Sequence, residues 1–343
     1  MISTPKKPIL SNPNQNYLTH PAPNPDHASQ PDLTLEAAIH FMDRLQENVN
    51  QAAVVEPQTL RLILTALLGH GHLLLEDVPG VGKTLVAKAL ARSISASFKR
   101  VQCTPDLLPS DITGASIYNQ KEQQFTFIPG PLFAQFVLVD EINRATPRTQ
   151  SSLLESMAER QVTVDGQRYQ LEQPFFLIAT QNPVETAGTF PLPEAQLDRF
   201  LISLSLGYPQ FENEVLILER EERDDPLNQL EAVLSPLDIL ALQHLVKNVG
   251  VVRPLKEYII RLLTATRNHP DVLLGVSPRG GVALQRAAQA MALLNHRMFV
   301  TPDDIKTVAH NVLKHRLITR DRSAELAHAL VTTILNAIPV PLD

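Results

Sequence analysis

Apolar runs alternate with helical patterns through the middle of the chain, from residue 72 to residue 206. Each run is short, and each is followed by a segment in which apolar residues recur at helical spacing. Strands of a parallel sheet need this composition, because helices cover both faces of such a sheet. The runs predict five strands: "HLLLE", "FKRVQC", "FVLVD", "FFLIAT" and "FLISLSL".

Helical patterns precede the alternating region. Ile39, Met42 and Leu45 lie on one stripe and predict an amphipathic helix over 35–48. A second helix is predicted over 57–68, where a proline stands at the first helical position.

After Pro209 the pattern becomes helical only. Three hydroxyl residues are followed by proline, and each pair suits the start of a helix, with a capping side chain before the first helical position. The pairs are Ser235-Pro236, Ser277-Pro278 and Thr301-Pro302. We therefore expect a small all-helical second domain.

These patterns divide the chain into four parts. Residues 1–33 are rich in Pro, Asn and Gln and predict a disordered tail. An αβα core is predicted over 34–208, a linker over 209–229, and the helical domain over 230–343. The fold class is therefore α/β, with a five-stranded parallel sheet and a smaller all-helical domain.

Composition excludes several classes of protein. A net charge of −6 and a pI near 6.0 argue against a general nucleic-acid coat, which needs a basic face. Cys103 is the only cysteine, so internal disulfides and cysteine-rich zinc sites are excluded and a cytoplasmic location is expected. No apolar run approaches the roughly 20 residues that a membrane span requires.

The stretch "GHLLLEDVPGVGKTLVAKAL" predicts a strand, a glycine-bearing loop and a helix. Such a loop turns its backbone N–H groups around a phosphate chain, and the helix N-terminus adds partial positive charge. Lys83 would reach the β- and γ-phosphates of ATP, and the Thr84 hydroxyl would ligate Mg²⁺. The full signature requires glycine at position 77, where this chain has Asp77. The candidate nucleotide-binding residues are Val78, Pro79, Gly80, Val81, Gly82, Lys83, Thr84 and Leu85.

Two acidic residues end the apolar run "FVLVDEIN". Beside a phosphate loop, Asp140 would hold Mg²⁺ through water, and Glu141 would polarise the water that attacks ATP. Without the loop, an acidic pair at a strand end would more simply face solvent.

Three further polar residues are candidates for the reaction. Asn182 follows the run "FFLIATQNP" and could orient the attacking water, although Asn-Pro is also ordinary turn chemistry. Arg199 precedes the last apolar run. Arg279 lies in the first turn of the "SPRGGVAL" helix, where the helix dipole disfavours a cation, so we expect an anionic partner for it.

Together these residues resemble the AAA+ ATPases, and specifically the MoxR family, over residues 37–335. The motifs that carry the resemblance are "EDVPGVGKT", "DLLPSDITGASIYNQ", "FIPGPLF", "VDEINRATPRTQSSLLESMAERQVTVDG", "IATQNPVETAGTFPLPEAQLDRF" and "SPRGGVAL". By position, the resemblance implies that Lys83 and Thr84 belong to Walker A and Asp140 and Glu141 to Walker B. It likewise makes Asn182 sensor 1, Arg199 an arginine finger and Arg279 sensor 2.

The resemblance also implies an assembly. MoxR-like proteins are similar to magnesium chelatase subunits and act as rings, so a homo-hexamer is expected, with each active site between subunits. ATP hydrolysis would move the core against the helical lid. The insertion "SIYNQKEQQFTFIPG" and the hairpin "VTVDGQRY" would grip a protein client inside the ring. A partner with a von Willebrand factor A domain is a further implication.

One departure from the family lies upstream of the loop. MoxR-like chains usually carry Val-Gly-Gln where this chain reads "VVEPQ", with Glu56 and Pro57. The preference for adenine is therefore open.

Two other functions remain as alternatives. A DNA motor similar to helicase-type AAA+ proteins would need a basic hairpin, and "QVTVDGQRYQL" offers only Arg168. A nucleotide-held scaffold that never turns ATP over would not need Glu141, Asn182 or Arg199.

Overall fold

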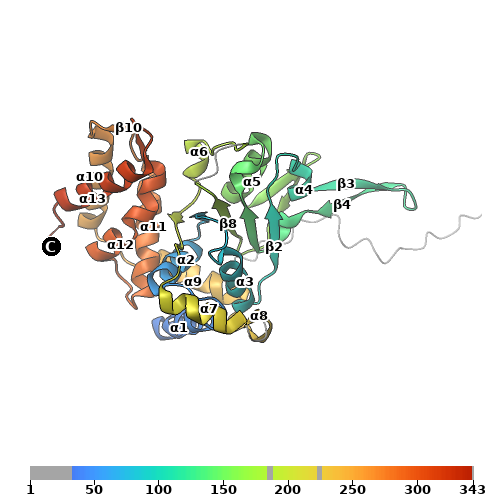
Figure 1. Cartoon of the computed structure of the whole chain (residues 1–343), viewed down its shortest axis with the longest axis horizontal. Coiled ribbons are helices and arrows are strands. Elements are labelled where there is room, and N and C mark those ends of the chain that lie inside the picture. The colour runs from blue at the N-terminus through green and yellow to red at the C-terminus, as the bar shows by residue number, and fades with distance from the viewer. Residues whose placement is uncertain (1–32, 184–187, 222–225, 342–343) are drawn as a thin grey trace, which may run out of the picture. The chain divides into compact units, whose positions relative to one another are not determined.

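Five parallel strands form the central sheet of the structure, a computed structural model that describes residues 33–183, 188–221 and 226–341 (Figure 1). The strand order is β2-β5-β8-β1-β9. All five predicted strands are confirmed. They are β1 (Leu73–Glu76), β2 (Phe98–Gln102), β5 (Phe136–Asp140), β8 (Phe176–Gln181) and β9 (Ile202–Leu204). The predicted tail lies outside the described residues except for Leu33.

Helices cover both faces of the sheet, as strands apolar on both sides require. Successive side chains of β1 point to opposite faces, so Leu73 and Leu75 enter one hydrophobic cluster and Leu74 enters another. The first cluster includes side chains of three helices that precede or follow β1, and the second includes side chains of a helix after β5. These helices are α1 (Leu35–Ala52), α2 (Pro57–Leu68), α3 (Lys83–Ser93) and α5 (Pro147–Glu159).

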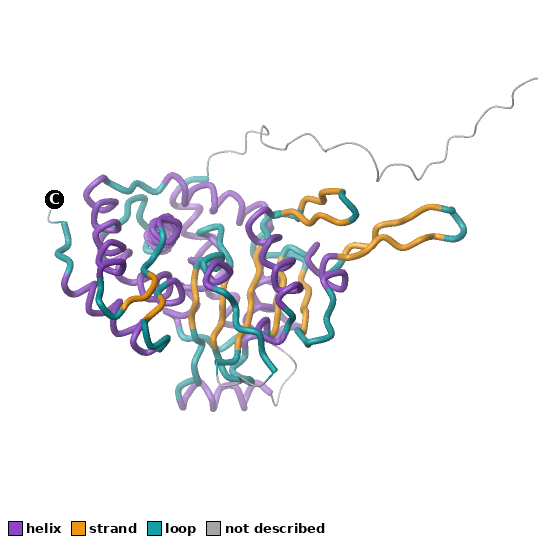
Figure 2. The backbone as a smooth tube through the Cα atoms, turned by 90° about the horizontal axis from the view of Figure 1, so that it is seen from above, coloured by secondary structure: helices purple, strands orange, loops and turns teal. Residues whose placement is uncertain are grey.

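Two β-hairpins extend from the core at one end of the molecule (Figures 1 and 2). The first joins β3 (Gly114–Asn119) to β4 (Gln124–Pro129), after the short helix α4 (Pro109–Thr113). The second joins β6 (Gln161–Val164) to β7 (Gln167–Gln170). Its turn has positive φ at Asp165 (51°) and Gly166 (77°), the geometry that favours Asp-Gly, so the predicted hairpin is confirmed.

The C-terminal part begins its helices where the sequence predicts. Ser235 and Ser277 accept hydrogen bonds from backbone N–H groups in the first turn of their helices, and Thr301 caps a third. One feature was not predicted: a short antiparallel pair, β10 (Val272–Leu274) and β11 (Ile318–Thr319), interrupts the helices. The helices are α9 (Pro236–Asn248), α10 (Arg253–Asn268), α11 (Pro278–Leu294), α12 (Pro302–Leu313) and α13 (Ala324–Ala337).

The segment predicted as a linker, 209–229, contains two helices, α7 (Phe211–Glu221) and α8 (Pro226–Gln229). By their contacts, Leu33–Asp343 form one unit, and one hydrophobic cluster includes side chains of α2, the sheet and α11. The boundary between an αβα core and a helical lid stays a prediction. Within the described residues, no helix is long and apolar enough to cross a membrane.

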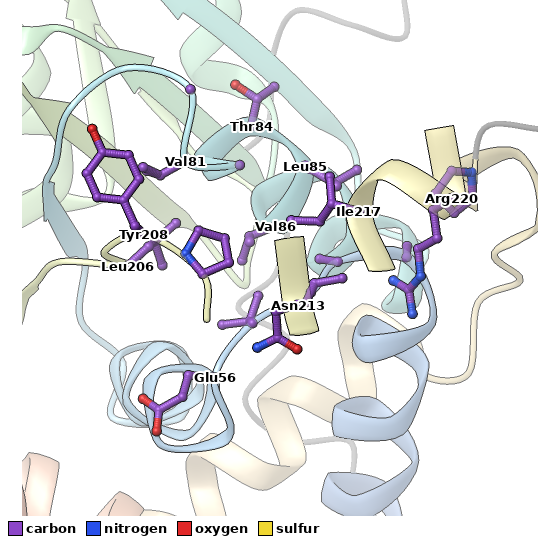
Figure 3. A pocket seen from close by; sticks show the side chains of 18 of the residues that line it. Glu56, Val81, Thr84, Leu85, Val86, Leu206, Tyr208, Asn213, Ile217 and Arg220 are labelled. Carbon is purple, nitrogen blue, oxygen red and sulfur yellow. The ribbon is translucent and has the colours of Figure 1, made fainter. Parts of the chain in front are cut away.

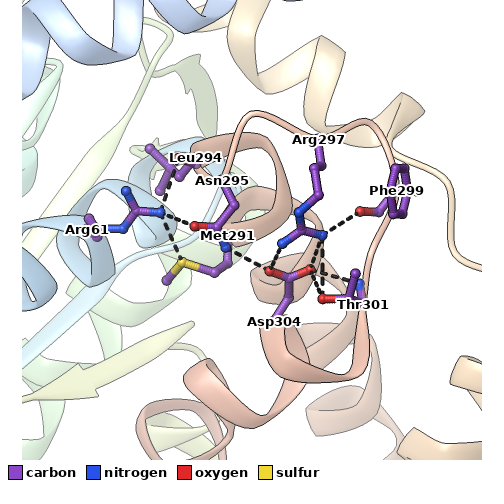
Figure 4. A network of polar contacts seen from close by, with 8 residues as sticks. All are labelled: Arg61, Met291, Leu294, Asn295, Arg297, Phe299, Thr301 and Asp304. Atoms are coloured by element: carbon purple, nitrogen blue, oxygen red, sulfur yellow. Dashed lines mark hydrogen bonds and ion pairs between the residues drawn. The ribbon is translucent and has the colours of Figure 1, made fainter. Parts of the chain in front are cut away.

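A polar network connects α2 to the C-terminal helices (Figure 4). The Arg61 guanidinium donates to the carbonyl oxygen of Leu294 at 3.1 Å and to the side chain of Asn295. Asn295 in turn donates to the buried carboxylate of Asp304 at 2.8 Å, which Arg297 contacts with both terminal nitrogens. Burial raises the pKa of Asp304, but these donors outweigh it and lower the pKa below its usual value.

His72 connects strand β8 to helix α5. Its Nδ1 accepts the N–H of Leu177 at 3.1 Å, so the proton resides on Nε2, which lies 3.2 Å from the carbonyl oxygen of Met157. Burial lowers the pKa of His72 from 6.5 to about 4, against the opposing effect of the Met157 hydrogen bond.

This histidine makes stability depend on acid pH. The unfolded chain binds a proton at His72 below about pH 6.5 while the folded chain does not, so stability falls as the pH drops from 6.5 toward 4. The loss from His72 alone should reach about 2 kcal/mol at pH 5. Denaturant unfolding at pH 8 and pH 5 measures it. His72→Gln should remove this part of the pH dependence, and the exposed His40→Gln should keep it. Equal pH dependence in both variants would contradict the assignment.

Candidate functional site

The phosphate loop lies between β1 and α3. Gly80 and Gly82 have φ values of 91° and 86°, in the left-handed region that favours glycine. A Cβ atom added at either position would meet nothing within 4 Å, so the loop surface is open. Helix α3 begins at Lys83, so the first backbone N–H groups of the helix point toward the loop. The loop therefore has the geometry of a phosphate site.

Lys83 lies across this loop. Its ammonium donates to the carbonyl oxygens of Asp77 and Val78, at 2.9 Å and 3.1 Å. Burial lowers the pKa of Lys83, and the carboxylates of Asp77, Asp140 and Glu141 act in the opposite direction. The lysine therefore stands among the candidate acidic residues.

Asp77 occupies the position at which the full signature has glycine. Its φ is not positive, so the backbone does not require glycine here. The buried carboxylate accepts the hydroxyl of Ser205 at 2.5 Å and the N–H groups of Leu206 and Gly207 at 2.7 and 3.2 Å. Asp77 thus joins the start of the loop to the segment after β9.

A cavity of about 700 Å³ adjoins the loop (Figure 3). Its walls come from the loop and α3, from the segment before α2, and from the segment that runs from β9 into α7. Glu56, at the site of the departure from the family, lines the cavity, and so do Asn213, Ile217 and Arg220 of α7. One guanidinium nitrogen of Arg220, Nη1, is buried without a partner among the described residues. The cavity has room for a base and ribose beyond the phosphate loop.

Asp140 lies at the carboxyl end of β5 and is only 6% exposed. Its carboxylate accepts the Arg100 Nε–H at 2.5 Å and the Thr180 hydroxyl at 3.3 Å. The same Thr180 oxygen accepts the N–H of Glu141 at 2.9 Å. Thr180 of β8 therefore fixes the two acidic residues relative to the neighbouring strand.

Glu141 follows in the left-handed region, with φ of 54°. Its Oε2 accepts the Gln102 amide at 2.8 Å and lies 3.2 Å from Nη1 of Arg144. Sequence reasoning did not identify Arg100, Gln102 or Thr180. Arg100 and Gln102 are two residues apart on a predicted strand, so both side chains point to the same face of the sheet. This spacing was the available signal for the pair.

The oxygen donors fit a magnesium ion. Mg²⁺ prefers hard oxygen ligands and keeps several waters, and it needs only one or two protein ligands beside substrate phosphates. The Asp140 carboxylate and the Thr84 hydroxyl supply such donors, and Thr84 lines the cavity beside the loop (Figure 3).

Asn182 directly follows β8, whose carboxyl end lies between those of β1 and β5. In a parallel sheet the carboxyl ends of the strands meet at one edge. This edge therefore brings Asn182 together with Lys83, Asp140 and Glu141.

Arg199 lies just before β9, at the edge of the sheet formed by the amino ends of the strands. Its guanidinium donates to the carbonyl oxygen of Leu154 in α5, and its Nε is buried without a partner among the described residues. Asp198, next to it, pairs with Arg316 at 2.7 Å instead.

Arg279 lies on the same side as Arg199. A Cβ atom on the adjacent Gly280 would lie 3.1 Å from Cδ of Arg316, and Arg316 donates to the carbonyl oxygens of Asp198 and Phe200. Arg279 is exposed and has no ion pair within the described parts of the chain. The expected anionic partner is therefore not found there. The structure separates the two candidate arginines from the phosphate loop of the same chain.

Comparisons with known proteins identify two matching regions. Residues 72–202 match the ATPase family associated with various cellular activities (AAA), and residues 264–338 match the AAA lid domain.

Relatives match over nearly the whole chain. An uncharacterized protein of Bacillus subtilis, YeaC, is 52% identical over 88% of this chain and 96% of its own length. Chaperone MoxR1 of Mycobacterium tuberculosis is 40% identical, over 90% of this chain and 84% of its own. A crystal structure of a protein assigned as an ATPase, from Cytophaga hutchinsonii, has a TM-score of 0.82 and 38% identity, and the match covers 89% of this chain and 97% of that one.

Proposed function

Because the chain belongs to the MoxR family of AAA ATPases, we propose that it binds ATP in the cavity beside the phosphate loop and hydrolyses it to ADP and phosphate. One observation carries the proposal. Thr180 holds the carboxylate of Asp140 and the backbone N–H of Glu141, so two acidic residues stand at the same sheet edge as Lys83. A protein that only held a nucleotide would not need a second carboxylate there.

Each residue of this edge has a distinct task. The loop 78–85 and Lys83 would hold the phosphates, and Thr84 and Asp140 would hold Mg²⁺. When bound, Mg²⁺ neutralises charge that develops on the phosphate oxygens. Glu141 would accept a proton from the attacking water, and Asn182 would orient that water. Glu141 would have to exchange the Gln102 amide for this water.

The remaining groups would come from a second chain. Arg199 and Arg279 lie away from the phosphate loop of their own chain, at the opposite edge of the sheet. The guanidinium of either arginine would therefore act on the γ-phosphate of ATP bound to the neighbouring subunit. Every subunit would act on the ATP of the next in the same way. Head-to-tail contacts close into a ring when the rotation between neighbours allows it. The number of six subunits is proposed from the family resemblance.

The two hairpins support a protein client. The first exposes apolar side chains on both of its faces: Ile117 (54%), Tyr118 (49%), Phe125 (69%) and Ile128 (51%). The second hairpin contacts the first, because Tyr169 stacks on Phe127 with ring centroids 4.2 Å apart. The two hairpins would therefore contact a client together. The chaperone name of one relative agrees with this role, and a partner with a von Willebrand factor A domain stays a proposal from family resemblance.

A steady-state assay tests the proposal against a DNA motor. The chain should release phosphate from ATP in the presence of Mg²⁺, and single-stranded DNA should leave the rate unchanged, because Arg168 is the one basic residue in 161–170. A motor that tracks a phosphate backbone needs more positive charge at its hairpins. Severalfold stimulation by DNA would favour the motor instead. Absence of phosphate release, with ATP bound, would favour a scaffold.

A further inference from the structure

Strand β2 contributes a cation to the acidic edge of the sheet. It pairs with β5 in parallel, with Arg100 opposite Leu138 and Gln102 opposite Asp140. Asp140 therefore lies two residues beyond Arg100 along the sheet, at about 3.3 Å of rise per residue. The long Arg100 side chain covers this distance, and its Nε–H donates to Oδ2 of Asp140 at 2.5 Å. A guanidinium thus contacts the carboxylate that would hold Mg²⁺.

Both oxygens of the Asp140 carboxylate are engaged. Oδ1 accepts the neutral hydroxyl of Thr180 at 3.3 Å, and Oδ2 accepts the charged donor of Arg100. The Asp140 side chain is 9% exposed, so water screens its negative charge poorly. A buried carboxylate is costly without a positive partner, and Arg100 supplies one.

The two partners of this ion pair differ in their freedom to move. The Arg100 side chain is 50% exposed, so its guanidinium can turn into water at little cost. The guanidinium contacts Asp140 through its Nε–H, whereas arginine binds carboxylates most firmly with two parallel donors. Its Nη2 contacts the amide oxygen of Gln102 at a longer 3.4 Å. Asp140 ends a strand that is buried throughout, so the arginine is the partner that can leave.

Mg²⁺ needs the same carboxylate. The ion takes oxygen ligands and keeps several waters, through which Asp140 would hold it. The ion and the guanidinium would then lie on one side chain, and two cations this close repel each other in a partly buried site. Arginine keeps its charge at any ordinary pH, so this repulsion ends only when the guanidinium moves away.

We propose that Arg100 and Mg²⁺ compete for Asp140, and that Arg100 thereby sets how strongly ATP binding depends on the metal. The inference rests on the proposed ATP and Mg²⁺ site and deepens it. Without Mg²⁺, the guanidinium neutralises Asp140, which lies near Lys83 and would otherwise repel the phosphates. With Mg²⁺, the metal must displace the guanidinium before it can use the carboxylate. Arg100 therefore strengthens metal-free binding of ATP and weakens metal-dependent binding.

The metal dependence of nucleotide affinity tests this competition. Calorimetric titration of a non-hydrolysable ATP analogue, once with EDTA and once with saturating Mg²⁺, gives two dissociation constants. Arg100→Gln should bind the analogue more weakly in EDTA and at least as tightly with Mg²⁺. The ratio of the EDTA constant to the Mg²⁺ constant should rise about five- to tenfold, the effect expected for one partly exposed charged contact.

Three further variants separate the charge from other effects of the substitution. Arg100→Met keeps the apolar stem of the side chain, loses the charge, and should raise the ratio as Arg100→Gln does. Arg100→Lys keeps a cation for a contact that uses one donor, so its ratio should stay within about twofold of wild type. Lys99→Gln removes a charge from the opposite face of β2, where the side chain is exposed, and should match wild type. Circular dichroism shows that each variant is folded.

The outcomes distinguish competition from other roles of Arg100. An unchanged ratio in both neutral variants, including equal weakening in EDTA and in Mg²⁺, would make Arg100 a structural residue and overturn the inference. A lower ratio would also overturn it, because Arg100 would then position Asp140 for the metal. Both results leave the proposed function intact. A wild-type chain that binds no analogue under either condition would overturn the proposed function together with this inference.

Discussion

Lys83→Ala should bind ATP about 100-fold more weakly, whereas Glu141→Gln should bind ATP normally and lose nearly all turnover. The lysine contributes charge-assisted hydrogen bonds to the phosphates in both ground and transition states, and such bonds contribute about 1.5–3 kcal/mol. The carboxylate acts only when water attacks, and a general base typically contributes about 10²–10⁴ in rate. The two variants therefore fail at different steps.

Calorimetric titration with ATP and a phosphate-release assay distinguish these steps. The exposed Lys99→Ala and Glu155→Gln make the same chemical changes away from the cavity, so both should match wild type. Normal turnover by Glu141→Gln would show that another group activates the water. Normal ATP affinity of Lys83→Ala would mean that the loop holds phosphate through its backbone alone.

Arg199→Ala should bind ATP and assemble, yet hydrolyse ATP about 10³ to 10⁵ more slowly, the range known for arginine fingers in GTPases. The reason is geometric: Arg199 lies at the amino end of β9, and the phosphate loop follows the carboxyl end of β1 in the same parallel sheet. Mixed rings provide the decisive measurement. An intact site in an Arg199→Ala subunit can then adjoin an intact finger in a Lys83→Ala subunit, and activity should return only at such interfaces.

Mass spectrometry must show that the mixed rings contain both variants. The exposed Arg148→Ala, on the helix that Arg199 contacts, serves as a control and should hydrolyse ATP normally by itself. If mixed rings stay as inactive as either parent, Arg199 acts within its own chain, where its bond to the Leu154 carbonyl oxygen would make it a structural residue.

Much of this architecture could be predicted because local signals agreed with the final packing. The run "HLLLE" alternates its leucines between two clusters, and Asp165-Gly166 adopts the positive φ values that its turn requires. The phosphate loop could be predicted for the same reason. Its features are local in sequence: glycine at positions 80 and 82, and a helix that begins at Lys83.

Other features depend on strand order, which no local pattern contains. Arg100 and Thr180 meet Asp140 only because β2 and β8 flank β5 in the sheet. Tyr169 stacks on Phe127, and this contact joins two hairpins that are distant in sequence. Strands β10 and β11 have two or three residues each, too short for an alternating pattern to appear.

The hydrophobic cluster shared by α2, the sheet and α11 has a mechanical consequence. The family resemblance implies movement of the core against the helical lid, which requires a weakly packed boundary between them. Here Arg61 and continuous apolar packing connect α2 and the sheet to α11. Bending within one chain would expose buried apolar area to water. In the proposed ring, motion should then occur at the contacts between subunits. Each subunit should move as a rigid body, and ATP hydrolysis should rotate neighbouring subunits relative to one another.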